Sequence, residues 1–184
     1  MKLIILDRDG VINEDSNDYI KSVDEWIPIP GSIEAIAALS AAGYTIVVAT
    51  NQSGIARKYF DEYELAAMHQ KMCLLVEEAG GEISGVFFCP HGPEEGCECR
   101  KPGLGLIKQI ETEFGMSAEG APFVGDTAKD ILVAKLAGCR PVLVKTGKGT
   151  VTLTQISAAE LAGVEIFETL EDFANNLLQK ESIS

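Results

Sequence analysis

Short apolar runs alternate with amphipathic segments along this chain, and this alternation constrains the fold more than any other feature of the sequence. The runs are rich in Val, Ile, Leu and Phe, which is typical of strands buried on both faces of a sheet. Between them, apolar residues recur at the spacing of a helix that packs one face on a core. The predicted strands cover residues 2–6, 44–50, 83–89, 122–125, 141–144 and 164–167. The predicted helices lie between Ser32 and Gly43, between Asp61 and Gly80, and over residues 104–114, 127–137 and 170–177.

Strands that alternate with helices favour right-handed crossovers and a mostly parallel sheet. We therefore predict an α/β fold, a Rossmann-like parallel sheet sandwiched by helices. The chain has 184 residues and shows no repeat or linker, so residues 1–184 are expected to form a single domain. In such sheets, ligands bind beyond the carboxyl ends of the strands. The residues predicted to stand there are Asp7, Thr50, Cys89 and Asp126.

The composition excludes two classes of partner. Asp and Glu number 28 against 15 Lys and Arg, which gives a formal charge of −13. Such an acidic chain lacks the basic surface that binds nucleic acids or anionic membranes, and it repels anionic substrates unless cations are supplied locally. No run approaches the ~18 apolar residues of a membrane span, and the first run is too short for a signal peptide. We expect a soluble cytoplasmic protein and, without a coiled-coil repeat, a monomer.

Asp7 and Asp9 follow the first predicted strand in a D-x-D-G motif. At this spacing one carboxylate can act as a nucleophile and the other as a general acid and base, although Asp and Gly are also common in plain turns. Asp126 follows the fourth strand, and three carboxylates at one sheet edge repel each other unless a cation is present. Mg²⁺ prefers oxygen ligands, so we predict a magnesium site formed by Asp7, Asp126 and a backbone carbonyl. Asp130 is a weaker candidate ligand that could instead cap its own helix.

A phosphate-binding loop is predicted after the second strand, where Thr50 and Asn51 precede a Gln-Ser-Gly sequence. A hydroxyl and successive backbone N–H groups form a cradle for an anion. Lys101, which follows Arg100 and precedes a predicted helix, would bring positive charge to phosphate oxygens, although such a pair is also common on solvated surfaces. Mg²⁺ and Lys101 would neutralise the attack of an anionic nucleophile on an anionic phosphate. Asp9 would first protonate the leaving oxygen and then activate the water that hydrolyses the aspartyl-phosphate.

The sequence also predicts a metal-binding loop over residues 89–99. The candidate ligands, in a C-x-H-x5-C-x-C pattern, are Cys89, His91, Cys97 and Cys99. Three thiolates and one imidazole fill the tetrahedral shell of Zn²⁺ and leave no open position, which is typical of a structural site. A disulfide is the alternative, and it fits a reducing cytosol poorly. The bound metal would fix the position of Arg100 and Lys101, which follow the loop directly.

These motifs, in this order and at the ends of strands, resemble those of the haloacid dehalogenase (HAD) superfamily of phosphatases. The resemblance covers residues 2 to about 149. It implies a HAD-like fold and a magnesium-dependent phosphomonoester hydrolase, and the inserted segments are too short for a separate cap domain. The residues that it assigns are Asp7 as nucleophile, Asp9 as acid and base, Thr50 and Lys101 on phosphate, and Asp126 on Mg²⁺ beside the main-chain carbonyl of Asp9.

Within this superfamily, the chain resembles the D-glycero-D-manno-heptose 1,7-bisphosphate 7-phosphatases. The sequences that carry the resemblance are DRDG, TNQSGIAR, the cysteine loop followed by RKPG, and VGD. That family removes the C7 phosphate of a phosphorylated sugar during the synthesis of lipopolysaccharide precursors. The resemblance implies that Asp15, Ser16 and Asn17 contact sugar hydroxyls, although a solvated polar loop is the alternative for this segment. It also implies that Arg100, assisted by Arg57, meets the second phosphate or the sugar.

Two other functions fit parts of the same pattern. The spacing of the zinc loop is also similar to that of the histidinol-phosphate phosphatases of histidine biosynthesis, and the loop does not separate the two families. A phosphorylated receiver domain likewise places an Asp and Mg²⁺ at strand ends, but Asp9 and the zinc loop argue against it. Three residues depart from the pattern of the heptose family, which leaves the fine substrate preference open: Lys58, Thr127 and Lys129. The sequence does not indicate the anomer at C1.

Overall fold

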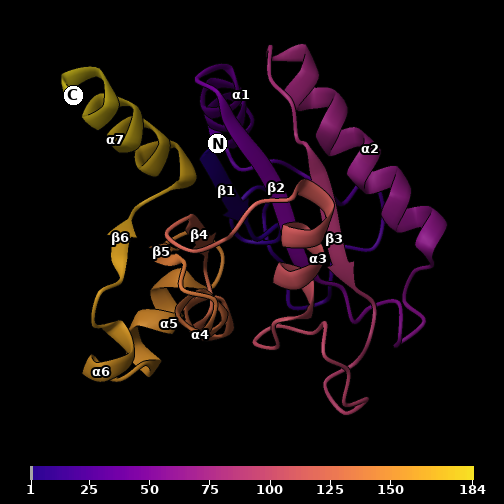
Figure 1. Cartoon of the computed structure of the whole chain (residues 1–184). Helices are drawn as coiled ribbons and strands as arrows, with labels where there is room; N and C mark the ends of the chain where they lie inside the picture. Colours follow the sequence, from indigo (N-terminus) through magenta and orange to yellow (C-terminus); the bar gives the residue numbers. More distant parts are fainter. Residues whose placement is uncertain (1) are drawn as a thin grey trace.

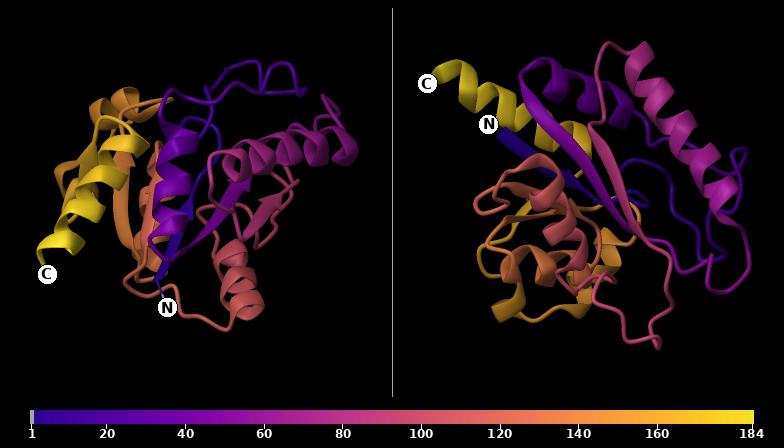
Figure 2. Two further views of the ribbon diagram at one scale, coloured as in Figure 1. Left: turned by 90° about the horizontal axis from the view of Figure 1, so that it is seen from above. Right: turned by 45° about the vertical axis from the view of Figure 1, so that its right-hand side comes forward.

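The computed structural model describes residues 2–184, which form a sheet covered by helices on both faces (Figure 1, Figure 2). The sheet formed by these residues has six strands in the order β3-β2-β1-β4-β5-β6. The strands are β1 (Lys2–Leu6), β2 (Tyr44–Asn51), β3 (Gly85–Cys89), β4 (Pro122–Gly125), β5 (Arg140–Val144) and β6 (Glu165–Phe167). Every neighbouring pair is parallel, so the predicted Rossmann-like α/β fold is confirmed.

The helices divide between the two faces of the sheet. They are α1 (Ser32–Ala41), α2 (Glu62–Glu78), α3 (Gly105–Phe114), α4 (Ala128–Leu136), α5 (Gly149–Gln155), α6 (Ala158–Leu161) and α7 (Leu170–Ile183). On one face α1, α2 and α7 contribute buried residues such as Ile36, Met68 and Phe173 to one apolar cluster. On the other face α3 and α4 contribute Ile107 and Val133 to a second cluster. The sheet therefore separates two apolar layers.

The central strand β1 contributes to both layers and positions the start of the loop that follows it. Its side chains alternate between the faces, so Ile4 lies in the first cluster and Ile5 in the second, and both are fully buried. The strand pairs with β2 on one side and with β4 on the other. Because these strands are parallel, the residues that follow all three gather at one edge of the sheet, beginning with Asp7.

Each connection between the first three strands contains one helix. The connection from β1 to β2 holds α1, the connection from β2 to β3 holds α2, and residues 2–184 contain no separate cap domain. Over the same span, none of the helices is both long enough and apolar enough to cross a membrane. The edge of the sheet that follows β1, β2 and β4 is therefore bordered by loops.

Most element predictions are confirmed, and the differences lie toward the C-terminus. The helix predicted after Asp61 is α2, which opens with a capping box formed by Asp61 and Glu64. Two helices, α5 and α6, were not predicted: α5 is rich in Thr and Val, which have low helix propensity, and α6 is a single turn opened by Ser157 and Glu160. Helix α7 extends to Ile183, past its predicted end at residue 177. The prediction ended there because the last turns are polar and carry no apolar repeat.

Candidate active site

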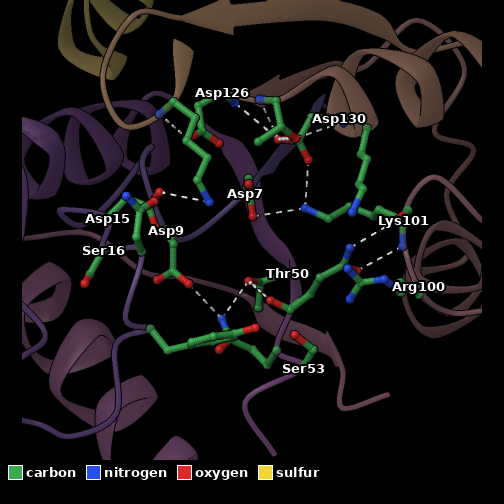
Figure 3. Close-up of a pocket in the computed structure, with 17 residues that line it drawn as sticks. Asp7, Asp9, Asp15, Ser16, Thr50, Ser53, Arg100, Lys101, Asp126 and Asp130 are labelled. Atoms are coloured by element: carbon green, nitrogen blue, oxygen red, sulfur yellow. Dashed lines mark hydrogen bonds and ion pairs between the residues drawn. The ribbon is translucent and has the colours of Figure 1, made fainter. Parts of the chain in front are cut away.

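Polar residues that follow the strands line one pocket of about 280 Å³ (Figure 3). The predicted site residues that line it are Asp7, Asp9, Asp15, Ser16, Asn17, Thr50, Asn51, Arg100, Lys101 and Asp126. Arg57 is not among the lining residues; it is exposed, and its guanidinium lies over the ring of Tyr19, which does line the pocket. The pocket thus joins segments that follow β1, β2, β3, β4 and β5.

Lys101 contacts residues from three segments around the pocket: the loop after β1, strand β2 and helix α4. Its buried ammonium donates to Oδ1 of Asp130 at 2.8 Å and to the carbonyl oxygen of Ala49 at 2.9 Å. The same nitrogen lies 3.0 Å from Oδ1 of Asp7. Burial opposes the charge of Lys101, but Asp130 and Asp7 outweigh burial and raise its pKa above the usual value. Lys101 is therefore charged and holds the carboxylate of Asp7 in place.

Three carboxylates lie close enough to share a cation. One oxygen from each of Asp7, Asp126 and Asp130 lies within 4.8 Å of the other two. Burial, followed by the negative charge of Asp130, raises the pKa of Asp7 well above its usual value. The same two causes raise the pKa of Asp126 to about 7. Oδ1 of Asp126 is buried without a hydrogen-bond partner, so a divalent cation with a preference for oxygen ligands fits this donor set.

Asp130 differs from the other two carboxylates because both of its oxygens are already engaged. Oδ2 accepts from the backbone N–H of Asp126 at 3.2 Å, from the N–H of Thr127 at 3.3 Å and from the Thr127 hydroxyl at 2.9 Å. Oδ1 accepts from Lys101. Burial favours the neutral acid, but the charge of Lys101 and these hydrogen bonds outweigh it and lower the pKa of Asp130. Asp130 therefore caps α4 and orients Lys101.

Two glycines allow the loops after β1 and β5 to approach Asp126. Gly10 and Gly147 have φ angles of 84° and 56°, in the left-handed region. A Cβ on Gly10 would overlap Oδ2 of Asp126 and would lie 3.1 Å from Cα of Gly147. The hydroxyl of Thr146 donates to the carbonyl oxygen of Gly10 at 2.6 Å. The loop after β5 is therefore fixed against the loop that carries the paired aspartates.

Replacing Gly10 with Ala is expected to weaken magnesium binding by about 10-fold or more, the scale seen when groups that support metal ligands are disturbed. The added methyl group would displace the carboxylate of Asp126. Activity titrated against Mg²⁺ measures the effect. Gly43→Ala is the matched control, because Gly43 has a φ of 96° but no atom within 4 Å of its Cβ position. An unchanged half-saturating Mg²⁺ concentration in Gly10→Ala would contradict this account.

Asp9 is held in the pocket by a set of hydrogen-bond donors. Its Oδ1 accepts from Nε of Arg8 and Nδ2 of Asn13, both at 2.9 Å. Its Oδ2 accepts from Nε2 of Gln52 at 3.1 Å. Burial would raise the pKa of Asp9, but the charge of Arg8 and these hydrogen bonds outweigh burial and lower it. Asp9 is therefore ionised and oriented before substrate arrives.

Arg8 and His69 form a buried support behind Asp9 that the sequence did not reveal. Arg8 is fully buried, and its NH1 lies 3.1 Å from Nε2 of His69 on α2. Burial, followed by the positive charge of Arg8, lowers the pKa of His69 to about 3. The imidazole is therefore neutral, and Nε2 accepts from Arg8 because a guanidinium can only donate.

The predicted anion cradle is linked to the segment before α3. Nδ2 of Asn51 donates to the carbonyl oxygen of Lys101 at 3.1 Å, and its Oδ1 accepts from the Lys101 backbone N–H at 2.9 Å. The hydroxyl of Thr50 accepts from Nε2 of Gln52 at 2.9 Å. The end of β2 thus positions the backbone of Lys101 as well as its own polar groups.

Several lining residues were not selected from the sequence. They are Tyr19, Gln52, Ser53, Thr127, Lys129 and Lys148. Gln52 and Ser53 belong to the same strand-end motif as Thr50, so the motif itself contained the signal. Lys148 follows β5, and its backbone N–H donates to Oδ2 of Asp126 at 2.9 Å.

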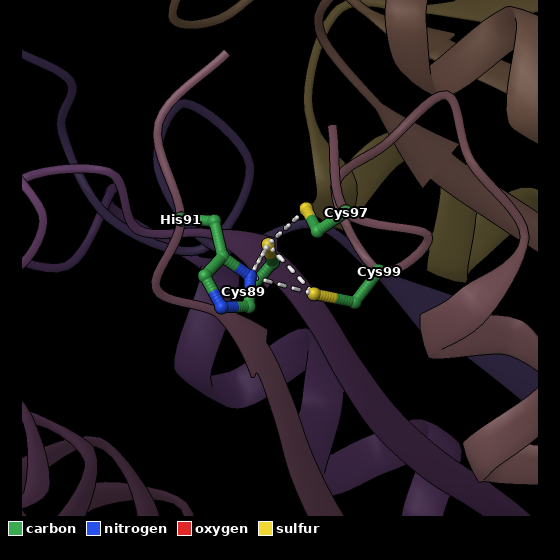
Figure 4. Close-up of side chains that lie close together, drawn as sticks. All are labelled: Cys89, His91, Cys97 and Cys99. Carbon is green, nitrogen blue, oxygen red and sulfur yellow. Dashed lines mark hydrogen bonds between the residues drawn. The ribbon is translucent and has the colours of Figure 1, made fainter. Parts of the chain in front are cut away.

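The four predicted ligands of the cysteine loop also lie together (Figure 4). One ligand atom from each lies within 4.8 Å of the others: Cys89, His91, Cys97 and Cys99. Sγ of Cys89 lies 2.9 Å from Sγ of Cys99 and 3.6 Å from Sγ of Cys97. Over residues 2–184 all cysteines are free thiols, so the disulfide alternative is not found. Three sulfur donors and an imidazole nitrogen fit a tetrahedral metal ion such as zinc.

Comparisons with known proteins agree with this geometry. A family model described as HAD-hydrolase-like matches residues 98–173. The D-glycero-beta-D-manno-heptose-1,7-bisphosphate 7-phosphatase of Pseudomonas aeruginosa is 55% identical over 177 residues, which cover 96% of this chain and 98% of that protein. The protein of the same name from Neisseria meningitidis is 50% identical over 182 residues, which cover 99% and 97% of the two chains.

The fold also matches a crystal structure of D,D-heptose 1,7-bisphosphate phosphatase from B. bronchiseptica, which is complexed with magnesium and phosphate. The TM-score is 0.94 and the sequence identity is 48%. The match covers 98% of this chain and 99% of that one. The fold and the pocket, taken with these matches, define a HAD-like hydrolase. This chain matches its relatives over nearly their whole length, so the family within the HAD-like hydrolases can also be assigned. The chain belongs to the D-glycero-beta-D-manno-heptose-1,7-bisphosphate 7-phosphatase family.

Proposed function

We propose that this protein removes the C7 phosphate of D-glycero-beta-D-manno-heptose 1,7-bisphosphate through an aspartyl-phosphate on Asp7. The observation that carries the proposal is the buried carboxylate of Asp7, which is held 3.0 Å from Lys101 and shares a cluster with Asp126. The names of the relatives supply the substrate and the β anomer. The alternative substrate histidinol phosphate lacks such support and serves as a control.

In the first half of the proposed reaction, a carboxylate oxygen of Asp7 attacks phosphorus, and the bond from phosphorus to the C7 oxygen breaks. The phosphate anion beside Asp9 favours the protonated form of that residue, which gives its proton to the leaving oxygen. In the second half, water attacks the phosphorus of the aspartyl-phosphate. Asp9 takes a proton from this water, the bond to Asp7 breaks, and inorganic phosphate leaves.

Asp7, Asp126 and the main-chain carbonyl of Asp9 would hold Mg²⁺. The buried Oδ1 of Asp126, which has no partner, supports this assignment, as does the magnesium named with the B. bronchiseptica relative. When bound, the ion would supply positive charge that offsets repulsion between Asp7 and the phosphate. Thr50 and Asn51 would contact phosphate oxygens from the end of β2.

We assign the sugar-binding side of the pocket to the loop after β1. Asp15, Ser16 and Asn17 would accept or donate hydrogen bonds to sugar hydroxyls, and Arg100 would meet the C1 phosphate. All four side chains belong to residues that line the pocket. Arg57 would act indirectly, because its guanidinium lies 5.9 Å from the ring centroid of Tyr19 and not in the pocket lining.

We also propose that the cysteine loop binds one structural zinc ion. The donor set of Cys89, His91, Cys97 and Cys99 has no position left for a substrate once a tetrahedral ion is bound. The ion would order a polar loop that has few apolar residues to pack. It would also fix Arg100 and Lys101, which begin one residue after the last ligand.

The proposed product keeps its C1 phosphate, which suits later nucleotide activation and a place in the synthesis of lipopolysaccharide precursors. We propose that the 184-residue chain carries out this reaction as one domain and as a monomer. Gel filtration coupled to light scattering measures the oligomeric state.

The proposed function predicts a kcat/KM for the β anomer of heptose 1,7-bisphosphate about 100-fold or more above that for histidinol phosphate. Each charge-assisted contact to a second phosphate contributes about 1.5–3 kcal/mol, which is roughly 10- to 150-fold. Phosphate release in the presence of Mg²⁺ measures both rates, and the α anomer is tested alongside. A higher kcat/KM for histidinol phosphate would replace the proposed substrate and leave the reaction class intact.

A further inference from the structure

Lys148 has no role in the reaction above, yet it lies in the same pocket. It stands in the loop after β5, where its backbone N–H donates to Oδ2 of Asp126 at 2.9 Å. Its ammonium lies 3.3 Å from Oδ2 of Asp15. Asp126 and Asp15 belong to different walls of the pocket (Figure 3). The side chain of Lys148 therefore reaches across the space that substrate must enter.

The cation that the sequence assigned to phosphate, Lys101, has little capacity left. An ammonium has three hydrogens, and Lys101 directs its three toward Asp130, Asp7 and the carbonyl oxygen of Ala49. A substrate that displaced the contact to Asp7 would gain only one of them. A phosphate monoester carries about −1.5 to −2 charges at pH 7. Besides the proposed Mg²⁺, the phosphate oxygens require a side-chain cation in addition to the one hydrogen that Lys101 could release.

Lys148 meets this requirement because its present ion pair is weak while its backbone is fixed. The side chain of Lys148 is 52% exposed and that of Asp15 is 16% exposed. Partly exposed pairs of this kind contribute about 0–1 kcal/mol, so a phosphate anion can replace Asp15. The loop itself is held by the hydrogen bond from Thr146 to Gly10 at 2.6 Å. The ammonium can therefore change partner while the backbone of Lys148 stays hydrogen-bonded to Asp126.

We propose that Lys148 binds the phosphoryl group that is transferred, exchanging the carboxylate of Asp15 for phosphate oxygens. This inference rests on the proposed phosphatase function and adds the residue that completes its phosphate site. The exchange also frees Asp15 to accept a hydrogen bond from a sugar hydroxyl. Binding of phosphate and of sugar would then be coupled through one ion pair.

The test uses inorganic phosphate as the probe, with Mg²⁺ present, and measures its Kd by calorimetry and its Ki against substrate. Lys148→Met is expected to raise both constants about 10- to 100-fold, the scale of a hydrogen bond to a charged group. Lys148→Arg, which keeps the charge, should recover part of this loss. Lys145→Met is the matched control, because Lys145 lies in the same loop but pairs with Glu168 at 2.8 Å. Melting temperatures check the fold, and Lys148→Gln serves as a second charge-removing variant.

The choice of substrates separates the competing explanations. If Lys148 binds the transferred phosphoryl group, kcat/KM falls by the same factor for the heptose bisphosphate and for a simple phosphomonoester. A loss confined to the bisphosphate, with unchanged phosphate binding, would assign Lys148 to the C1 phosphate and overturn the proposal, as would no loss at all. If the wild-type protein does not prefer the heptose bisphosphate, the proposed substrate fails, but phosphate binding still tests Lys148.

Discussion

Replacing Asp7 with Asn is expected to lower kcat by at least about 10⁴-fold, because the amide cannot attack phosphorus and nucleophile removal has effects of this size in other hydrolases. The structure gives a reason to expect that the variant still folds. The pKa of Asp7 is raised by burial and by the charge of Asp130, so the carboxylate is costly in its present environment. A neutral amide removes that cost while it loses the ion pair to Lys101.

The measurement is phosphate release with saturating Mg²⁺, together with the melting temperature of each variant. Asp24→Asn is a suitable control, since Asp24 is an exposed carboxylate in the segment between β1 and α1. It should change neither activity nor stability. Mass spectrometry of acid-quenched wild-type enzyme should detect the added phosphate on the peptide that contains Asp7. Activity of Asp7→Asn above about one per cent of wild type would remove Asp7 from the nucleophile role.

Loss of the metal from the cysteine loop is the second large effect that we expect. Replacing Cys99 with Ser should reduce zinc from about one ion per chain to a small fraction and lower the melting temperature by about 5–11 °C. This range follows from a site held at about 100 times its Kd, which contributes about 2.7 kcal/mol, at about 2–4 °C per kcal/mol. Activity should fall as well, because Lys101 lies two residues after Cys99 and contacts Asp7.

Cys73→Ser is the control for the zinc experiment, because Cys73 is a half-buried residue of α2 outside the metal cluster. Elemental analysis and thermal unfolding should show a full complement of zinc and a nearly unchanged melting temperature for this variant. Wild-type protein that contains no zinc but has the same melting temperature as the metal-loaded form would refute a stabilising metal site. Retained activity in Cys99→Ser would show that the contacts of Lys101 with Asn51, Ala49 and Asp130 hold it in place without the metal.

The sequence predicted those parts of the fold that depend on local pattern. A strand buried on both faces must be a continuous apolar run, so β1, β2 and β4 were visible in the sequence. The polar residues that follow them, including Asp7 and Asp126, were then placed correctly by the rule that parallel strands end at one edge. Helices α5 and α6 were missed because both are short: α5 is rich in Thr and Val, which have low helix propensity, and α6 buries no residue that would mark an apolar face.

The sequence could not show contacts made by side chains from distant segments. His69 contacts Arg8 from 61 residues further along the chain, and no sequence motif contains both residues. Lys148 enters the pocket only because the loop after β5 packs on Gly10, which no spacing along the chain encodes. Arg57 shows the reverse case: it follows the predicted phosphate-binding loop, but its guanidinium lies over the ring of Tyr19.

The central position of β1 has a consequence for the way this enzyme is made. The strand leaves the ribosome before the other five, and its partner β4 is more than a hundred residues further along the chain. At about 5–20 residues per second, several seconds pass before the backbone N–H of Asp7 can meet the carbonyl oxygen of Val124. During that interval an apolar strand has one unpaired edge, which favours chaperone binding or aggregation. The pocket is therefore complete only after residues 146–148 have emerged.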